Sequence, residues 1–285
     1  MSDPAHSSRL FPSAEQDAER AERIPATPQT LSPAYRLAFA DPDFLGRDEL
    51  RPVRLQLELL KPEMALDEAG IRSTVVMFGG ARVPAPGATV PQARLWMSGF
   101  YEEARRFARI VGEECVRREG RELVVTTGGG PGVMEAGNMG ASEAGAPTMG
   151  LNIVLPHEGA PNAFVTPELS FNFHYFAVRK FVFLRRAAAI AVFPGGFGTL
   201  DELFEVLTLI QTKRMSPLPI LLFGRSFWER IVDWRALVEA GTIAAGDLDL
   251  FTMVDTADEG WAIIAPALGV IPQAPDRGAG SAGAD

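Results

Sequence analysis

Short apolar runs alternate along the chain with longer segments whose apolar residues recur at helical spacing. The runs predict strands at 74–78, 123–127, 148–155, 168–174, 188–193 and 218–223, with a further short strand near 251–254. The segments between them predict helices at 92–118, at 133–144, around Arg179 and Lys180, and at 200–213, 227–239 and 259–268. Alternating strands and helices predict an α/β fold with a doubly wound, mostly parallel sheet.

The two ends of the chain differ from this regular centre. Residues 1–32 are rich in Ser, Pro, Ala and charge and lack sustained periodicity, which predicts a flexible N-terminal arm. Over 33–70 the apolar residues take helical spacing, which predicts a helical extension packed on the main domain or on a second subunit. The main domain is expected over 71–271, and the Gly/Ala/Pro-rich segment 272–285 predicts a disordered tail.

Three of the predicted strands end in glycine-rich loops. These are Gly79-Gly80, the Gly-Gly-Gly-Pro-Gly sequence at 128–132, and the Pro-Gly-Gly-Phe-Gly sequence at 194–198 that leads into the 200–213 helix. Strand, glycine loop and helix in succession aim backbone N–H groups at a phosphate or another anion. Because the carboxyl ends of parallel strands share one edge, the three loops together predict a site for a nucleotide-sized ligand.

Several common chemistries fit this sequence poorly. A dinucleotide G-x-G-x-x-G begun at Gly130 or Gly196 has Glu135 or Asp201 in its third glycine position, and no G-x-x-x-x-G-K-[ST] is present. The sequence also lacks the G-x-S-x-G elbow of an α/β-hydrolase. Its 3 histidines are scattered without metal-ligand spacing, which gives a zinc site little support.

The composition of the chain limits which binding partners and which cellular compartment we expect. A net charge of -9 argues against DNA or RNA as a main partner. The single cysteine, Cys115, cannot form an internal disulfide, which indicates a reducing cytoplasm. No apolar run approaches the roughly 18–20 residues that span a bilayer, and the N-terminus lacks the apolar core of a signal peptide. We therefore expect a soluble, cytoplasmic protein that binds neither nucleic acid nor membranes.

Three motifs, in this order, resemble one known family. They are Gly-Gly-Gly-Pro-Gly-Val-Met-Glu-Ala at 128–136, Arg179-Lys180, and a complete P-G-G-x-G-T-x-x-E signature at 194–202. Together they are similar to the LONELY GUY (LOG) family of Rossmann-like proteins, over about residues 74–270. Characterised members, long labelled lysine decarboxylases, hydrolyse the N-glycosidic bond of AMP or cytokinin ribotides to a free base and ribose 5-phosphate. This sequence differs from short plant-type members in its N-terminal extension and in Gly79-Gly80-Ala81-Arg82, where those have a Cys-Gly-Ser-Ser type loop.

The resemblance implies roles for the motif residues. Glu202 would hold the ribose hydroxyls, stabilise the oxocarbenium-like sugar and position water, and Arg179 would orient the nucleotide or assist departure of the base. Backbone N–H groups at 130–133 and 195–199 would hold the 5'-phosphate. The resemblance also implies a homodimer or larger assembly, with the active site near the subunit interface and no cofactor. The expected substrate-binding residues are Gly79, Gly80, Gly129, Gly130, Gly132, Val133, Lys180, Gly195, Gly196, Gly198 and Thr199.

These residues also have structural interpretations. Thr199 and Glu202 fit the T-x-x-E capping box, and spacing alone favours that interpretation of Glu202. Arg179 stands in a basic run, where a helical arginine is usually a surface group. The three motifs taken together reverse both preferences. An aromatic cluster could stack on a base, although core or interface packing explains it better: Phe171, Phe173, His174, Tyr175 and Phe176.

Two other functions remain open. The P-G-G-x-G-T-x-x-E signature is also similar to that of molybdenum-cofactor carrier proteins, which hold a phosphorylated ligand without turnover. A non-catalytic nucleotide or molybdenum-cofactor carrier is therefore the alternative to the hydrolase. A pyridoxal-phosphate-dependent lysine decarboxylase has only the older family label in its favour, because no segment resembles a Ser-x-His-Lys cofactor site.

Overall fold

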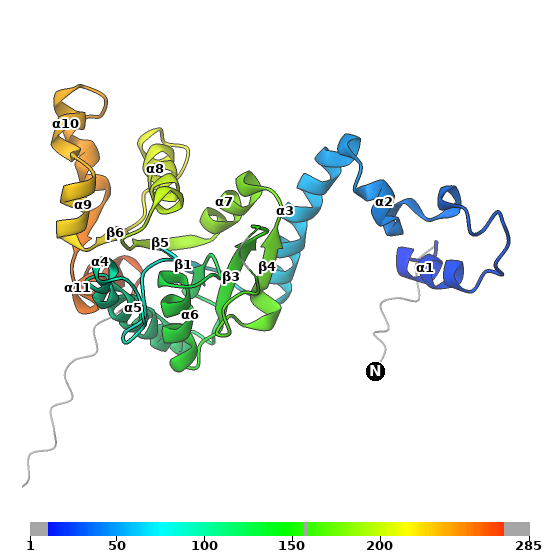
Figure 1. The fold of residues 1–285 in the computed structure, drawn as a ribbon, viewed down its shortest axis with the longest axis horizontal. Helices are drawn as coiled ribbons and strands as arrows, with labels where there is room; N and C mark the ends of the chain where they lie inside the picture. The colour runs from blue at the N-terminus through cyan, green and yellow to red at the C-terminus, as the bar shows by residue number, and fades with distance from the viewer. Residues whose placement is uncertain (1–10, 157–158, 271–285) are drawn as a thin grey trace, which may run out of the picture. The chain divides into compact units, whose positions relative to one another are not determined.

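The computed structural model describes residues 11–156 and 159–270. Within these residues, 7 strands form one sheet in the order β4-β3-β2-β1-β5-β6-β7 (Figure 1). They are β1 (Thr74–Phe78), β2 (Val124–Thr127), β3 (Thr148–Ile153), β4 (Ser170–Phe173), β5 (Ala187–Val192), β6 (Ile220–Phe223) and β7 (Thr252–Val254). Every neighbouring pair is parallel, so the predicted doubly wound α/β fold is confirmed.

Helices cover both faces of the sheet (Figure 1). The first face packs against the part of α3 (Arg51–Glu68) that follows Leu57, and against α7 (Phe176–Arg185), α8 (Phe197–Gln211), α9 (Arg225–Ile231) and α10 (Trp234–Glu239). The second packs against α5 (Ser98–Arg117), α6 (Val133–Glu143) and α11 (Ala257–Ala267). Residues of β1 alternate between them: Val76 and Phe78 join the first core, and Val75 and Met77 the second. This burial on both faces explains why the strands appear in the sequence as continuous apolar runs.

The strand order reverses at β1. The chain runs outward through β2, β3 and β4 on one side, then returns to lay β5 beside β1 and continues through β6 and β7. The loops that follow β1, β2 and β5 therefore emerge next to one another at the carboxyl edge of the sheet, where parallel α/β sheets bind ligands. These are the three glycine-rich loops that the sequence analysis identified.

Some helix boundaries differ from the prediction. The 92–118 helix is divided into α4 (Gln92–Leu95) and α5, and the 227–239 helix into α9 and α10. Helix α8 begins at Phe197 and not at Leu200. Its N-cap residue is Gly196, which has no side chain to cap the helix. Glu202 consequently lies in the second turn of α8. The capping-box interpretation of Glu202 is therefore wrong.

The described residues up to Leu57, 11–57, form a separate compact unit. Its described part contains α1 (Ala14–Glu22), α2 (Pro42–Leu45), the beginning of α3, and 3-10 turns at Pro33–Tyr35, Ala38–Ala40 and Asp48–Leu50. Helix α1, with a reciprocal capping box between Ser13 and Gln16, lies in the segment predicted to be a flexible arm. The boundary between the two units falls inside α3, between Leu57 and Glu58.

The second unit begins at Glu58 and so includes the last part of α3. It also contains short 3-10 helices at Pro167–Leu169 and Ala245–Leu250. The predicted disordered tail at 272–285 lies outside the described residues, as do residues 1–10 of the predicted arm.

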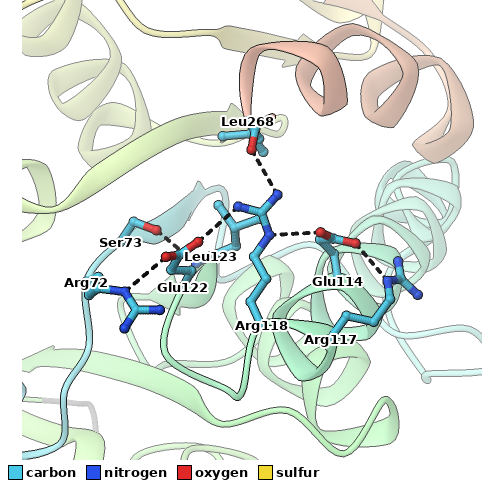
Figure 2. A network of polar contacts seen from close by, with 8 residues as sticks. All are labelled: Arg72, Ser73, Glu114, Arg117, Arg118, Glu122, Leu123 and Leu268. Carbon is cyan, nitrogen blue, oxygen red and sulfur yellow. Dashed lines mark hydrogen bonds and ion pairs between the residues drawn. The ribbon is translucent and has the colours of Figure 1, made fainter. Parts of the chain in front are cut away.

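A polar network at the opposite end of the strands joins the segment before β2, the end of α5 and the residue that follows α11 (Figure 2). The Arg118 guanidinium donates to Glu114 at 2.8 Å, to Glu122 at 3.0 Å and to the carbonyl oxygen of Leu268 at 2.9 Å. Burial raises the pKa of the Glu114 carboxyl, but hydrogen bonds from Arg118 and Arg117 outweigh burial and leave this pKa below its ordinary value. The buried charge of Glu114 therefore depends on its arginine partners.

Arg118→Ala should lower the free energy of unfolding by about 2–4 kcal/mol at neutral pH, because Glu114 then keeps a buried charge with one partner fewer. The loss should shrink as pH falls, because a protonated Glu114 no longer needs the cation. Urea unfolding at pH 7 and pH 4 measures both effects. Arg109→Ala, at an exposed position of the same helix, is the control and should cost less than about 0.5 kcal/mol. Equal losses for the two variants would contradict this account.

Candidate functional site

The three glycine loops pack against one another through their backbones. The N–H of Gly80 donates to the carbonyl oxygen of Pro194 at 3.0 Å, and the N–H of Val133 donates to the carbonyl oxygen of Gly80 at 3.3 Å. A Cβ atom on Gly80 would lie 3.1 Å from the Gly195 Cα, and one on Gly132 would lie 2.5 Å from the Gly80 carbonyl oxygen. Gly132 also has a φ of 69°, which favours glycine. The predicted meeting of the loops at one sheet edge is thus found in the structure.

Arg179 is a buried residue whose guanidinium lies against the β2 loop. The side chain of Arg179 is fixed by its Nε, which donates to the carbonyl oxygen of Leu151 at 2.7 Å. A Cβ atom on Gly128 would lie 2.6 Å from Arg179 Nη2, so a side chain at Gly128 would displace the guanidinium. The Arg179 Cζ also lies 5.3 Å from the centre of the Phe183 ring, within cation–π range. The interpretation of Arg179 as a surface group is therefore wrong.

Glu202 is a partly buried carboxyl whose proton affinity is strongly altered. Burial raises its pKa to about 7, against a lowering contribution from Arg179. The neighbouring carboxylates of Asp201 and Glu205 raise this pKa further, and Lys180 lowers it. A carboxyl with a pKa near 7 can hold or release a proton at neutral pH, which is the property of a general acid or base.

Lys180 joins the helix of Arg179 to the helix of Glu202. Its Nζ lies 2.7 Å from an Asp201 oxygen and 3.3 Å from a Glu205 oxygen, both on α8. The sequence analysis placed Lys180 among the phosphate-binding residues. Its charge is directed at these two carboxylates, so in this structure Lys180 fixes α7 against α8.

The first turn of α8 presents backbone donors to a ligand. Its N-cap, Gly196, has no side chain that could cap the helix. In the described part of the chain, no acceptor is paired with the N–H groups of Phe197, Gly198 and Thr199. The Thr199 side chain is buried directly beneath Gly195, where a Cβ atom would overlap it. An anion at this turn would receive several N–H bonds and the favourable end of the helix dipole.

Three of the other residues expected at the phosphate have already used their N–H groups. Val133, at the start of α6, donates to Gly80, and Gly129 donates to the Thr127 hydroxyl at 2.9 Å. The N–H of Gly80 is bonded to Pro194. These residues shape the loops, and the start of α8 is the better anion site.

Polar side chains that the sequence analysis did not single out support the β2 loop. The amide of Asn162 donates to the carbonyl oxygens of Gly129 and Gly130, at 3.1 and 3.0 Å. Asn138, buried in α6, accepts from the Thr127 hydroxyl at 2.6 Å and from the Asn162 amide at 2.9 Å. Asn138 gave one signal in the sequence, a polar residue within a helix of small and apolar residues. Asn162 comes from a loop and gave none.

A cavity of about 550 Å³ adjoins the β2 loop on the side of β3 and β4. Neither Glu202 nor Arg179 lines it, so the cavity is separate from the catalytic pair expected from the sequence. Its polar lining includes Asn152, whose side chain also packs against Gly129. The other lining residues are Gly130, Pro131, Glu135, Ile153, Val154, Leu155, Gly159, Ala160, Pro161, Asn162, Ala163, Phe164, Ser170 and Asn172.

Three other features bear on function: metal binding, membrane crossing and cysteine reactivity. Within residues 11–156 and 159–270, no group of three or more His, Cys, Asp or Glu side chains is arranged to hold a metal ion. Across the same residues, no helix combines the length and apolar character needed to cross a membrane. Burial raises the pKa of Cys115 to about 11, so this thiol stays protonated and is a poor nucleophile.

Comparison with known families tests the resemblance inferred from the motifs. Residues 134–264 match the family model described as possible lysine decarboxylase. The match confirms the resemblance to the LOG family. It runs from α6 into α11 and so contains Arg179, Lys180 and the signature at 194–202.

Solved structures similar to this chain include two from molybdenum-cofactor proteins. The molybdenum cofactor binding protein from Rippkaea orientalis is 16% identical, covering 69% of this chain and 98% of its own, with a TM-score of 0.46. The molybdenum cofactor carrier protein from Chlamydomonas reinhardtii is 17% identical, covering 70% of this chain and 99% of its own, with a TM-score of 0.45. At these values the likeness carries no functional argument. No curated protein matches the chain.

The raised pKa of Glu202 predicts a pH-dependent effect on stability. Ionising Glu202 in the folded state is unfavourable, so the wild type should lose stability between about pH 4.5 and pH 7. Glu202→Gln removes this loss. The free energy of unfolding of the variant minus that of the wild type should therefore be about 2–3 kcal/mol larger at pH 8 than at pH 5. Urea unfolding at both pH values measures this difference.

Glu229→Gln, which removes an exposed carboxylate from α9, is the matched control for that experiment. Its stability relative to the wild type should change little between pH 5 and pH 8. A Glu202→Gln variant that behaves like this control would show that the Glu202 carboxyl ionises without cost in the folded protein.

Proposed function

We propose that this chain hydrolyses the N-glycosidic bond of a nucleoside 5'-monophosphate, giving a free base and ribose 5-phosphate. The observation that carries the proposal is the joint placement of Glu202, with a pKa of about 7, and the buried cation Arg179 beside an open helix N-terminus. In this proposal a phosphate, a sugar that becomes positively charged and a departing base would each meet a group of matching charge. AMP or a cytokinin ribotide is the expected substrate, and residues 71–271 are the proposed catalytic domain.

The start of α8 is the proposed phosphate site. Donors on Phe197, Gly198 and Thr199 would bind the phosphate oxygens, and the helix dipole would add to this binding. Glu202 lies one helical turn further along α8 than Gly198. A 5'-phosphate fixed at the first turn would therefore bring the ribose towards the Glu202 carboxylate.

Glu202 is the proposed catalytic carboxylate. In its ionised form it would accept hydrogen bonds from the ribose hydroxyls and stabilise the positive charge that develops on the sugar. Water then forms the new bond to the anomeric carbon, and the bonding pair of the C–N bond leaves with the base, which takes up a proton. Low water access around Glu202 and Arg179 strengthens their interaction with this transition state.

Arg179 is the proposed partner for the nucleotide itself. Its Nε is held by Leu151, which leaves the guanidinium oriented at the β2 loop. A fixed cation there would orient the nucleotide and favour electron density on the departing base. The role of Arg179 depends on the planar shape and directed N–H groups of its guanidinium as well as on its charge. A lysine has the charge but not this shape, so it would not replace Arg179.

The assembly is proposed to be a homodimer or a larger homo-oligomer in the cytoplasm. On α7, next to the buried Arg179, Phe176 and Phe181 are each 52% exposed. Covering such aromatic side chains is favourable, and a second subunit placed there would also exclude water from the catalytic residues.

The alternative is a protein that binds a phosphorylated ligand without cleaving it. The open N–H groups at the start of α8 favour phosphate binding in either case. A nucleotide or molybdenum cofactor that copurifies intact, together with no release of base, would favour this carrier function.

Purified protein incubated with AMP and with isopentenyladenosine monophosphate should release free base, detected by chromatography. Glu202→Ala should lower kcat/KM by about 10²–10⁴-fold, because the sugar cation loses its carboxylate. Arg179→Ala should lower it by about 10²–10³-fold. Arg185→Ala, an exposed arginine on the same helix, should keep the wild-type rate. No base from any nucleoside monophosphate would refute the proposed hydrolase.

The pH dependence of kcat/KM should report the Glu202 carboxyl. Since the ionised form is needed, the rate should rise with pH and level off above about pH 7. Lys180→Met removes a cation that lowers this pKa, so the rising limb should move to higher pH. A rate that is already constant at pH 5 would exclude Glu202 as the titrating group.

A further inference from the structure

Helix α7, which carries Arg179, has no capping side chain of its own. Its N-cap is Tyr175, and its first turn contains no acidic residue. The backbone N–H groups of His174 and Tyr175 instead donate to the two carboxylate oxygens of Glu58, at 2.8 and 3.0 Å. Glu58 lies on α3, 116 and 117 positions away from these residues in the sequence.

This contact is stronger than an ordinary helix cap. A carboxylate at a helix N-terminus both satisfies donors that the helix cannot satisfy and complements its dipole. Hydrogen bonds to an ionised acceptor are also shorter and stronger than those between neutral groups. Because each oxygen of Glu58 receives a different N–H, the contact fixes the position and the orientation of the first turn of α7.

The position of that turn decides where the Arg179 guanidinium lies. Arg179 comes one turn after Tyr175, and its backbone N–H donates to the Tyr175 carbonyl oxygen at 3.1 Å. Its side chain fits a narrow place, bonded to Leu151 through Nε and in contact with Gly128. A small displacement of α7 would lengthen the bond to Leu151 or press the guanidinium into the β2 loop.

We propose that Glu58 is a positioning residue for Arg179, acting through the N-terminus of α7. The inference rests on the proposed function and deepens it, since it assigns part of the active-site geometry to a helix that begins in the N-terminal unit. Glu58 touches neither the expected substrate nor the reacting atoms. Its effect on the reaction passes through the backbone of His174 and Tyr175.

Glu58→Ala should lower kcat by roughly tenfold to a hundredfold, the size expected from a small misplacement of a catalytic group, with a smaller change in KM. Glu58→Gln should fall between Ala and the wild type, because its amide keeps one oxygen acceptor. Glu63→Ala is the matched control: Glu63 lies on the same helix, but it pairs with Arg186 at 3.2 Å and with Arg185 at 3.9 Å, at the C-terminal end of α7 and away from its N-terminus. This control should keep the wild-type kcat even if the protein becomes less stable.

A double-mutant cycle separates positioning from a general loss of structure. If Glu58 acts through Arg179, adding Glu58→Ala to Arg179→Ala should cause no further loss of rate. The NMR signal of the Arg179 Nε–H supplies a readout without activity. Its exchange with solvent should become faster in Glu58→Ala and stay unchanged in Glu63→Ala.

The possible failures are distinguishable. A wild type that releases no base refutes the proposed function, and this inference with it. An active wild type together with a full-rate Glu58→Ala, a further loss in the Arg179→Ala background, or an unchanged Arg179 Nε–H signal overturns this inference alone.

Discussion

Close backbone contact between three loops is the constraint on which the site depends. The β1 loop lies between the other two, because Gly80 bonds to Pro194 on one side and Val133 on the other. Side chains at Gly80, Gly132 or Gly195 would crowd these contacts, and at Gly128 the missing Cβ leaves room for Arg179. A larger residue at these positions would press the loops apart and shift the start of α8, the proposed phosphate site, relative to the β2 loop.

Charge balance gives this geometry its chemical character. Burial makes the ionised form of Glu202 unfavourable, and Arg179 offsets only part of that cost, so the pKa settles near 7. Two further carboxylates beside Glu202 are held by Lys180, which prevents an uncompensated cluster of negative charge. In the proposed hydrolysis, fixed charges of this kind would need little reorganisation as positive charge develops on the sugar.

The sheet and the loops could be predicted from the sequence, because parallel strands buried on both faces appear as apolar runs and glycine-rich loops follow them. It could not give the start of α8: the apolar pattern begins at Leu200, while the helix already includes Phe197. It also gave no sign that Arg179 is buried or that Asn162 supports the β2 loop. Contacts between distant segments leave no local pattern, and the bond from Tyr175 to Glu58 is such a contact.

A crystal structure with bound ribose 5-phosphate, the expected product, tests the central claim most directly. The account predicts the phosphate at the N–H groups of Phe197, Gly198 and Thr199, with ribose hydroxyls within hydrogen-bond distance of Glu202. Ribose 5-phosphate found in the cavity beside Asn152, with Glu202 and Arg179 free of contact, would contradict it.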